Sequence, residues 1–193
     1  RDYYASRGLG DVYKRQDDDQ RKDGGILNFA KYQETHPNAS YTPRYEDTGY
    51  FLLKYLPRQG GNSQCTGDKD LNYRNNLRVY RYAETLLNAA ELILRTGGDT
   101  AEAQNYLDQV RARAYRTTVE NLGAHKVVAN IDNVLEERHL ELYGEGKRFW
   151  DLVRSGKANE VLGSRGYKDN KKYLPIPSSE IDKSAGTLTQ NPY

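Results

Sequence analysis

The sequence of 193 residues contains no methionine, one cysteine and one tryptophan. The single Cys65 excludes an internal disulfide and a cysteine-rich metal site, and its polar neighbours favour a free surface thiol. No apolar run approaches the roughly 18 residues that a membrane-spanning helix needs, which excludes a transmembrane protein for the sequence present. Lys and Arg number 29 against 27 Asp and Glu, so the net charge is only +2, and no long basic run occurs. Electrostatic binding to nucleic acid is therefore not favoured.

Tyrosine is abundant where the other aromatic residues are scarce, with 17 Tyr against three Phe. Much of the 36% hydrophobic fraction therefore carries a hydroxyl group, and the mean hydropathy is −0.96. By its length the chain forms about one domain.

The first residues lack an initiator methionine and the apolar stretch of a signal peptide, so we expect the start to be processed or incomplete. Residues 1–16 show neither the period of a strand nor that of a helix. They resemble the translated sequencing adaptors found at the ends of metagenomic reading frames. We predict a non-native or disordered start over residues 1–16.

Residues 17–75 form a loop-rich segment with many Tyr, Pro and Gly, in which 26–29 and 50–55 could be short strands. Three consecutive Asp beginning at Asp17 are similar to a calcium loop. However, Arg21 occupies a ligand position and no Glu closes the loop. We therefore expect a solvated acidic turn there.

Residues 76–193 are predicted to be mostly helical. Apolar residues recur at steps of three and four, as one helix face requires: Val79, Tyr82, Ala83, Leu86, Leu87, Ala90 and Leu94. Gly97 suits the end of this helix and Asp99 the N-cap of a second helix reaching Ala114. The short connection predicts an antiparallel hairpin of the size of a tetratricopeptide unit.

Further helices are expected within residues 125–162, interrupted at Gly144 and Gly146. From 163 onward the chain is loop-like, with an extended Leu174–Pro177 because each proline disfavours a helical residue before it. The predicted fold class is mainly α, with tetratricopeptide-like helical hairpins and long irregular loops.

Glu137, Glu141 and Glu145 recur at four-residue steps on one helix face. Carboxylates stacked in this way usually pair with basic residues, and catalysis would need a pair facing across a cleft. We predict ion pairs, with these basic residues nearby: Arg138, Lys147 and Arg148. Asp151 is expected to pair with Arg148, three residues before it.

No histidine has a second ligand at the spacing of a helical zinc site, so neither a metal nor a cofactor is predicted. Trp150 has apolar neighbours in Phe149 and Leu152, which favours core packing over stacking on sugar. The candidate carbohydrate-binding residues are Tyr41, Tyr45 and Tyr50. Like Tyr32, they lie in or beside irregular sequence. Tyrosine offers a broad apolar face and a hydroxyl to polar ligands, although the same residues could instead pin loops to helices.

Five ordered segments resemble motifs of the SusD/RagB family. The segments are Thr48–Tyr55, Arg81–Glu91, Leu107–Ala114, Glu137–Arg154, and the closing Leu174–Pro177 with Gln190–Pro192. Arg81–Glu91 is similar to "RYAEvLLnyAEa", and Glu137–Arg154 to "ERxxELxxEGxRxxDLxR". Because these motifs fall on helix faces and ion pairs, they look like scaffold.

The resemblance implies a cell-surface, outer-membrane lipoprotein that binds glycans for nutrient uptake. It further implies delivery of oligosaccharides to a SusC-like TonB-dependent transporter, and binding without catalysis. The chain would be a fragment, the C-terminal third or so, of a larger α-helical SusD-like fold, with its lipid anchor outside this sequence. A soluble helical-repeat protein-interaction module is the alternative, and a glycan-processing enzyme ranks last.

Overall fold

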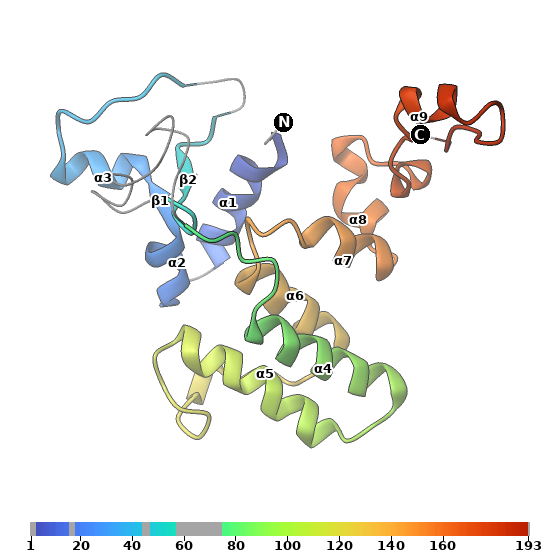
Figure 1. Cartoon of the computed structure of the whole chain (residues 1–193). Coiled ribbons are helices and arrows are strands. Elements are labelled where there is room, and N and C mark those ends of the chain that lie inside the picture. The colour runs from blue at the N-terminus through green and yellow to red at the C-terminus, as the bar shows by residue number, and fades with distance from the viewer. Residues whose placement is uncertain (1–2, 16–17, 44–46, 57–74, 193) are drawn as a thin grey trace. The chain divides into compact units, whose positions relative to one another are not determined.

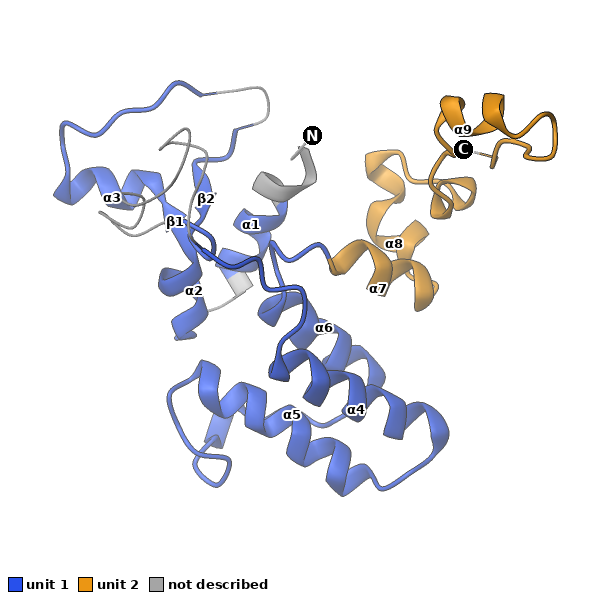
Figure 2. Cartoon of the chain, viewed as in Figure 1, with its two compact units in different colours: residues 1–146 blue, residues 147–193 orange. Residues whose placement is uncertain are grey.

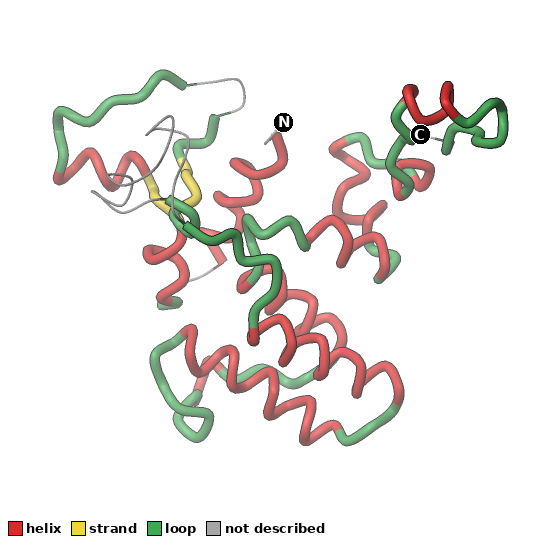
Figure 3. Tube along the Cα trace, viewed as in Figure 1, coloured by secondary structure: helices red, strands yellow, loops and turns green. Residues whose placement is uncertain are grey.

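The computed structural model describes residues 3–15, 18–43, 47–56 and 75–192 (Figure 1). The chain divides into two compact units, residues 1–146 and 147–193 (Figure 2). Helices dominate, beside one pair of short strands in the described part (Figure 3), and the predicted mainly α fold is confirmed. Among these residues, no helix combines the length and apolarity needed to cross a membrane.

The first unit contains, in chain order, α1 (Tyr3–Arg15), α2 (Gln20–Gly25), β1 (Ile26–Asn28), α3 (Phe29–Thr35), β2 (Tyr50–Leu52), α4 (Tyr82–Thr96), α5 (Thr100–Ala114), the 3-10 helix η1 (Gly123–His125) and α6 (Ile131–Glu141). The second unit contains α7 (Arg148–Arg154), α8 (Ala158–Leu162), the 3-10 helices η2 (Gly163–Arg165) and η3 (Asp169–Lys172), and α9 (Ser178–Lys183).

Helices α4 and α5 form the predicted hairpin. Gly97, in the left-handed conformation at φ +71°, ends α4, and its N–H donates to the carbonyl of Ile93. Asp99 caps α5 by accepting a 2.8 Å hydrogen bond from the backbone N–H of Ala101. The first helix begins at Tyr82, so Val79, assigned to its face by spacing, lies outside it and is exposed.

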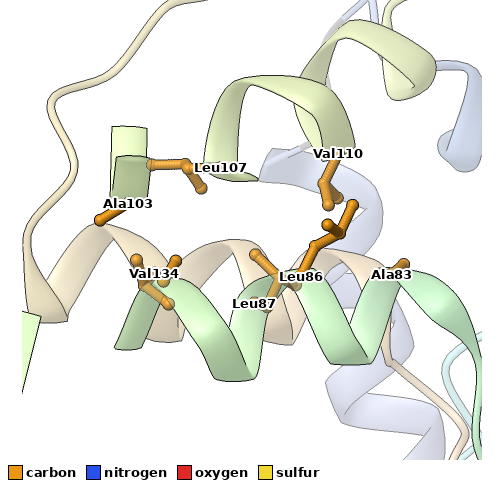
Figure 4. Close-up of a cluster of buried hydrophobic side chains, with 8 residues drawn as sticks. Ala83, Leu86, Leu87, Ala103, Leu107, Val110 and Val134 are labelled. Atoms are coloured by element: carbon orange, nitrogen blue, oxygen red, sulfur yellow. The ribbon is translucent and has the colours of Figure 1, made fainter. Parts of the chain in front are cut away.

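The main hydrophobic core lies between α4, α5 and α6 (Figure 4). Its buried members are Ala83, Leu86, Leu87 and Ala90 of α4, Ala103, Leu107 and Val110 of α5, and Val134 of α6. A two-helix hairpin cannot bury both of its faces. Here α6 covers the inner face as a third helix.

The prediction of a disordered start is wrong for residues 3–15, which form α1. Leu9, Val12 and Tyr13 are buried in a second cluster with Ile26 and Tyr143. These three residues lie on one face of the helix, and their contact with apolar side chains far along the chain stabilises it. The non-native origin of residues 1–16 stays a prediction.

The strands suggested by the sequence are present and pair with each other. β1 and β2 are antiparallel, with Ile26 opposite Leu52 and Asn28 opposite Tyr50. Backbone hydrogen bonds extend the pairing at both ends: Leu53 N donates to the Gly25 carbonyl and Phe29 N to the Gly49 carbonyl, each at 2.9 Å. This hairpin-like ribbon places α3 and the loop after it beside β2.

In the second unit, the prediction that Trp150 is a core residue is wrong. Trp150 is 48% exposed and contacts Phe149 edge-on at a ring separation of 5.1 Å. Leu152 takes the buried position on α7. Two positions along a helix differ by about 200° in direction, so Leu152 and Trp150 cannot face the same core. The chain beyond 163 also has more helix than expected, although Leu174–Pro177 is non-helical as predicted.

Replacement of a core side chain tests the packing of α4, α5 and α6. Leu107→Ala is expected to lower the free energy of unfolding by about 2–5 kcal/mol, because a fully buried leucine leaves a cavity. Leu92→Ala on the exposed side of α4 is the matched control and should change it by less than about 0.5 kcal/mol. Urea denaturation followed by circular dichroism measures both, and equal losses would contradict this core assignment.

Candidate functional site

Three carboxylates on one face of α6 and just beyond it form the electrostatic centre of the first unit. The carboxylate of Glu141 is buried and binds Arg81 at 2.6 Å, Arg21 at 3.0 Å and Arg113. These guanidinium groups come from α2, from the residue preceding α4, and from α5. One buried side chain therefore joins three separate parts of the chain.

The other two carboxylates extend this network in both directions. Glu137, 1% exposed, binds Arg21 at 2.7 Å and Arg111 at 2.6 Å. The Glu145 carboxylate binds Lys54 and Arg81, each at 2.8 Å. The predicted ion pairs are thus confirmed, and the network continues from α5 to the loop after β2.

Burial and ion pairing act in opposite directions on these groups. Burial alone would raise the pKa of Glu141, but the hydrogen bond from Arg113 and the charges of Arg21, Arg113 and Arg81 lower that pKa to about 2. Burial opposes protonation of Arg21, yet Glu137 and Asp19 raise its pKa. For Lys54, burial prevails and lowers the pKa. The lowered pKa values of Glu141 and Glu145 and the raised pKa values of Arg21 and Arg81 keep these four groups charged at neutral pH.

Glu137, Glu141 and Glu145 bind basic residues other than those expected from sequence proximity. Arg138 points to α4 instead, where it contacts Glu84 at 3.7 Å and donates to the side chain of Asn88. Asp151 pairs with Arg154 at 2.7 Å, and its expected pairing with Arg148 stays a prediction. The partners of Glu137, Glu141 and Glu145 come from other parts of the chain, whereas the buried Asp151 pairs within its own helix.

A pocket of about 230 Å³ opens beside this network. It is lined by Arg21, Lys54, Tyr55, Arg78, Arg81, Glu141 and Glu145. Lys54 also lies 3.8 Å above the ring of Tyr143, whose hydroxyl donates to the carbonyl of Arg21 at 2.8 Å. Glu141 and Glu145 are engaged by several cations each, so they are structural carboxylates rather than an acid–base pair across a cleft.

Aromatic rings gather around α3 and β2. The ring of Tyr41 meets those of Phe29 and Phe51 edge-on, at centroid separations of 4.5 and 4.9 Å. The Tyr41 hydroxyl donates to Asp47 at 3.1 Å, and burial together with this bond raises the pKa of Tyr41. Asp47 in turn accepts a hydrogen bond from the N–H of Gly49. The predicted Tyr41 is therefore a fixed, half-buried residue at the base of this cluster.

A second pocket of about 230 Å³ lies against this aromatic cluster. It is lined by Phe29, Ala30, Gln33, Ser40, Tyr41 and Gly49. Aromatic faces combined with an amide and a hydroxyl are the mixture that polar ligands with apolar ring faces require. Unlike the pocket beside α6, it has no charged side chain in its lining.

The structure does not bring the three predicted tyrosines into one site. Tyr45 lies outside the described residues. Tyr50 faces α1, where its ring lies 5.0 Å from that of Tyr13. Tyr41 alone lines the pocket beside α3. The contribution of Phe29 and Gln33 was not anticipated, although their four-residue spacing places both on one face of a helix.

The described residues contain no group of three or more His, Cys, Asp or Glu side chains able to hold a metal ion. Asp19, in the segment considered as a calcium loop, caps α2 and binds Arg21 at 2.5 Å. Residues 18–25 are thus organised by a helix cap and an ion pair.

Comparison with known proteins identifies the family. Residues 13–193 match the model of the SusD family. The chain belongs to the SusD family. The tetratricopeptide-like hairpin, the α6 carboxylates and the closing motif are all within the matched range, and residues 1–12 are outside it.

Several SusD-family relatives cover most of this chain. Surface glycan-binding protein A from Bacteroides thetaiotaomicron, solved in complex with laminarihexaose, is 45% identical with a TM-score of 0.81, over 95% of this chain and 40% of its own. A laminarin-binding SusD-like protein is 42% identical with a TM-score of 0.77, over 95% of this chain and 36% of its own. SusD-like protein P2 of Formosa agariphila is 27% identical over 89% of this chain and 34% of its own length. The chain therefore spans between a third and two fifths of the length of these three relatives.

The α6 network predicts a loss of stability in acid. The pKa of Glu141 lies at about 2 in the folded chain, below its usual value of 4.5, so its stabilisation is complete above about pH 5 and disappears as the pH falls towards 2. The loss should reach about 3 kcal/mol for this residue, and the lowered pKa of Glu145 adds to it. Urea denaturation at pH 7, 5, 4 and 3 measures the slope.

Two variants test whether the loss of stability in acid comes from the Glu141 carboxylate. Glu141→Gln should be less stable at pH 7 and lose less stability on acidification, because the titrating group is gone. Glu34→Gln removes an exposed carboxylate on α3 and should follow the wild type. An acid profile unchanged by Glu141→Gln would contradict the role given to this carboxylate.

Proposed function

We propose that this protein binds oligosaccharides at the bacterial cell surface for nutrient uptake. The observation that carries the proposal is the 45% identity and TM-score of 0.81 to a surface glycan-binding protein solved with laminarihexaose. A second similar structure is described as laminarin-binding. A neutral glucan of the laminarin type is therefore the glycan class that we favour.

The site chemistry supports binding without turnover. The buried carboxylates of α6 are held by arginine and lysine side chains, and they lie on one helix and its extension rather than across a cleft. The pocket beside α3 has an aromatic and uncharged lining that suits a neutral sugar. We infer that the protein holds glycans and leaves their cleavage to other proteins.

The proposal also includes the cellular location and the transporter partner, which are inferred from the family. In the intact protein, a lipid anchor would keep the glycan-binding surface outside the outer membrane. The bound oligosaccharide would pass to a SusC-like TonB-dependent transporter. The alternative of a soluble protein-interaction module is disfavoured by the family match over residues 13–193.

Titration calorimetry with laminarihexaose tests the proposal directly. We expect saturable binding, and no increase in reducing sugar after prolonged incubation of the pure protein with laminarin. Cellohexaose, built from the same sugar with another linkage, is the control and should bind more weakly. Release of reducing sugar would overturn the proposal of binding alone, and absence of laminarihexaose binding would overturn the glycan class.

Tyr41 is proposed to contribute the wall of the sugar pocket. Tyr41→Ala should weaken laminarihexaose binding by about 1 kcal/mol, because the pocket loses an aromatic wall that Phe29 and Phe51 hold in place. Tyr173→Ala removes an exposed tyrosine of the second unit and should leave affinity unchanged. A lowered melting temperature with unchanged affinity would show that Tyr41 serves packing only.

A further inference from the structure

Tyr32 and His36 form a parallel stack of rings at the C-terminal end of α3. Their ring centroids are 4.0 Å apart and the planes differ by 9°. Both side chains are exposed, Tyr32 to 37%. The Nδ1 atom of His36 lies 2.9 Å from the hydroxyl of Thr35 and 3.2 Å from the carbonyl of Tyr32, which fixes the imidazole plane. The stack is therefore flat, ordered and open to solvent.

A second tyrosine–histidine stack in this chain serves packing and provides a comparison for the stack on α3. Tyr115 and His125 stack at 3.9 Å and 13°, and both are half-buried. Arg111 covers this pair, with its guanidinium 5.4 Å from the Tyr115 ring and its Nε donating to the His125 carbonyl at 2.7 Å. Packing explains that stack, whereas the stack on α3 remains open to solvent.

The exposed stack continues into the uncharged pocket. Phe29, Tyr32 and Gln33 lie at helical positions i, i+3 and i+4, on one face of α3, and His36 is the residue that follows the helix. The rings of Phe29 and Tyr32 are 6.1 Å apart, and Phe29 and Gln33 line the pocket. An aromatic surface thus runs from the stack to the pocket along α3, the light-blue helix of Figure 1.

The polar groups of the pocket are positioned to receive hydroxyl groups. The Nε2 atom of Gln33 donates to the carbonyl of Ala39 at 2.9 Å. The Oε1 atom of the same side chain is thereby left as an acceptor for a ligand hydroxyl group. That oxygen and the hydroxyl of Ser40 have no hydrogen-bond partner in the part of the chain that the structure describes. A volume of about 230 Å³ is below the roughly 300–1,000 Å³ typical of drug-sized ligands, so it suits a single sugar unit.

We propose that this face of α3 is a glycan-contact subsite: the Tyr32–His36 stack supports the C–H face of one sugar ring, and the adjoining pocket receives a neighbouring unit. The assignment rests on the proposed function. The uncharged lining selects a neutral glycan, since an acidic sugar would find no cation in the pocket. Rings that are already ordered lose little conformational freedom when the ligand arrives.

Single substitutions in the 193-residue chain, titrated with laminarihexaose, test the subsite. Tyr32→Ala and His36→Ala should each weaken binding about fivefold, as expected for one lost aromatic contact. Tyr32→Phe keeps the ring and should keep wild-type affinity. Tyr173→Ala, in the second unit, is the control for an exposed tyrosine and should bind as the wild type. Melting temperatures close to that of the wild type confirm that the variants are folded.

The histidine signals give a second readout that does not depend on mutation. The chain has three histidines, so the Hε1 resonance of each can be followed by NMR during the titration. His36 should shift with saturation, while His125, in the half-buried stack, should not.

The outcomes separate this subsite from the proposed function. A chain that binds laminarihexaose while Tyr32→Ala and His36→Ala bind equally well overturns the subsite alone. A chain that binds no laminarihexaose overturns the glycan class and the subsite together. Weakened binding by both alanine variants, with the His36 resonance shifted, supports both.

Discussion

The fold of the first unit depends on three carboxylates that extend from α6. Glu137, Glu141 and Glu145 would be costly to bury as free anions. Each is matched by cations that other elements supply, so the elements must come together at this one helix face. The result is a network in which α2, the loop after β2, the start of α4 and the helix α5 share the same anions.

Hydrophobic packing and this ion-pair network stabilise different parts of the first unit. The α4–α5 hairpin and α6 bury a contiguous apolar core. The segment from residue 18 to 56 has short helices, two three-residue strands and few large aliphatic side chains. Charged contacts through Arg21 and Lys54 hold that segment against the helices, which leaves its aromatic residues available to form the surface around α3.

Much of the helical scaffold was predictable because local signals define it. Apolar spacing, Gly97 and Asp99 indicated the hairpin and its turn, and the four-residue spacing of the glutamates indicated ion pairs. The partners of those glutamates could not be derived, because Arg21 and Arg111 are distant in sequence. Trp150 was misjudged because apolar neighbours in sequence point in other directions on a helix. Leu9, Val12 and Tyr13 share one face of the helix over residues 3–15, but their apolar partners lie far along the chain. The Tyr32–His36 stack depends on where α3 ends.

The long reach of Arg21 has a consequence for biosynthesis. Its partner Glu137 is 116 positions further along the chain. At about 5–20 residues per second, the ribosome needs on the order of 6–20 s to make that stretch. During this interval the segment around α2 and α3 has emerged without the anions that later hold it. The segment around α2 therefore gains these ion pairs only after the later residues of α6 have been made.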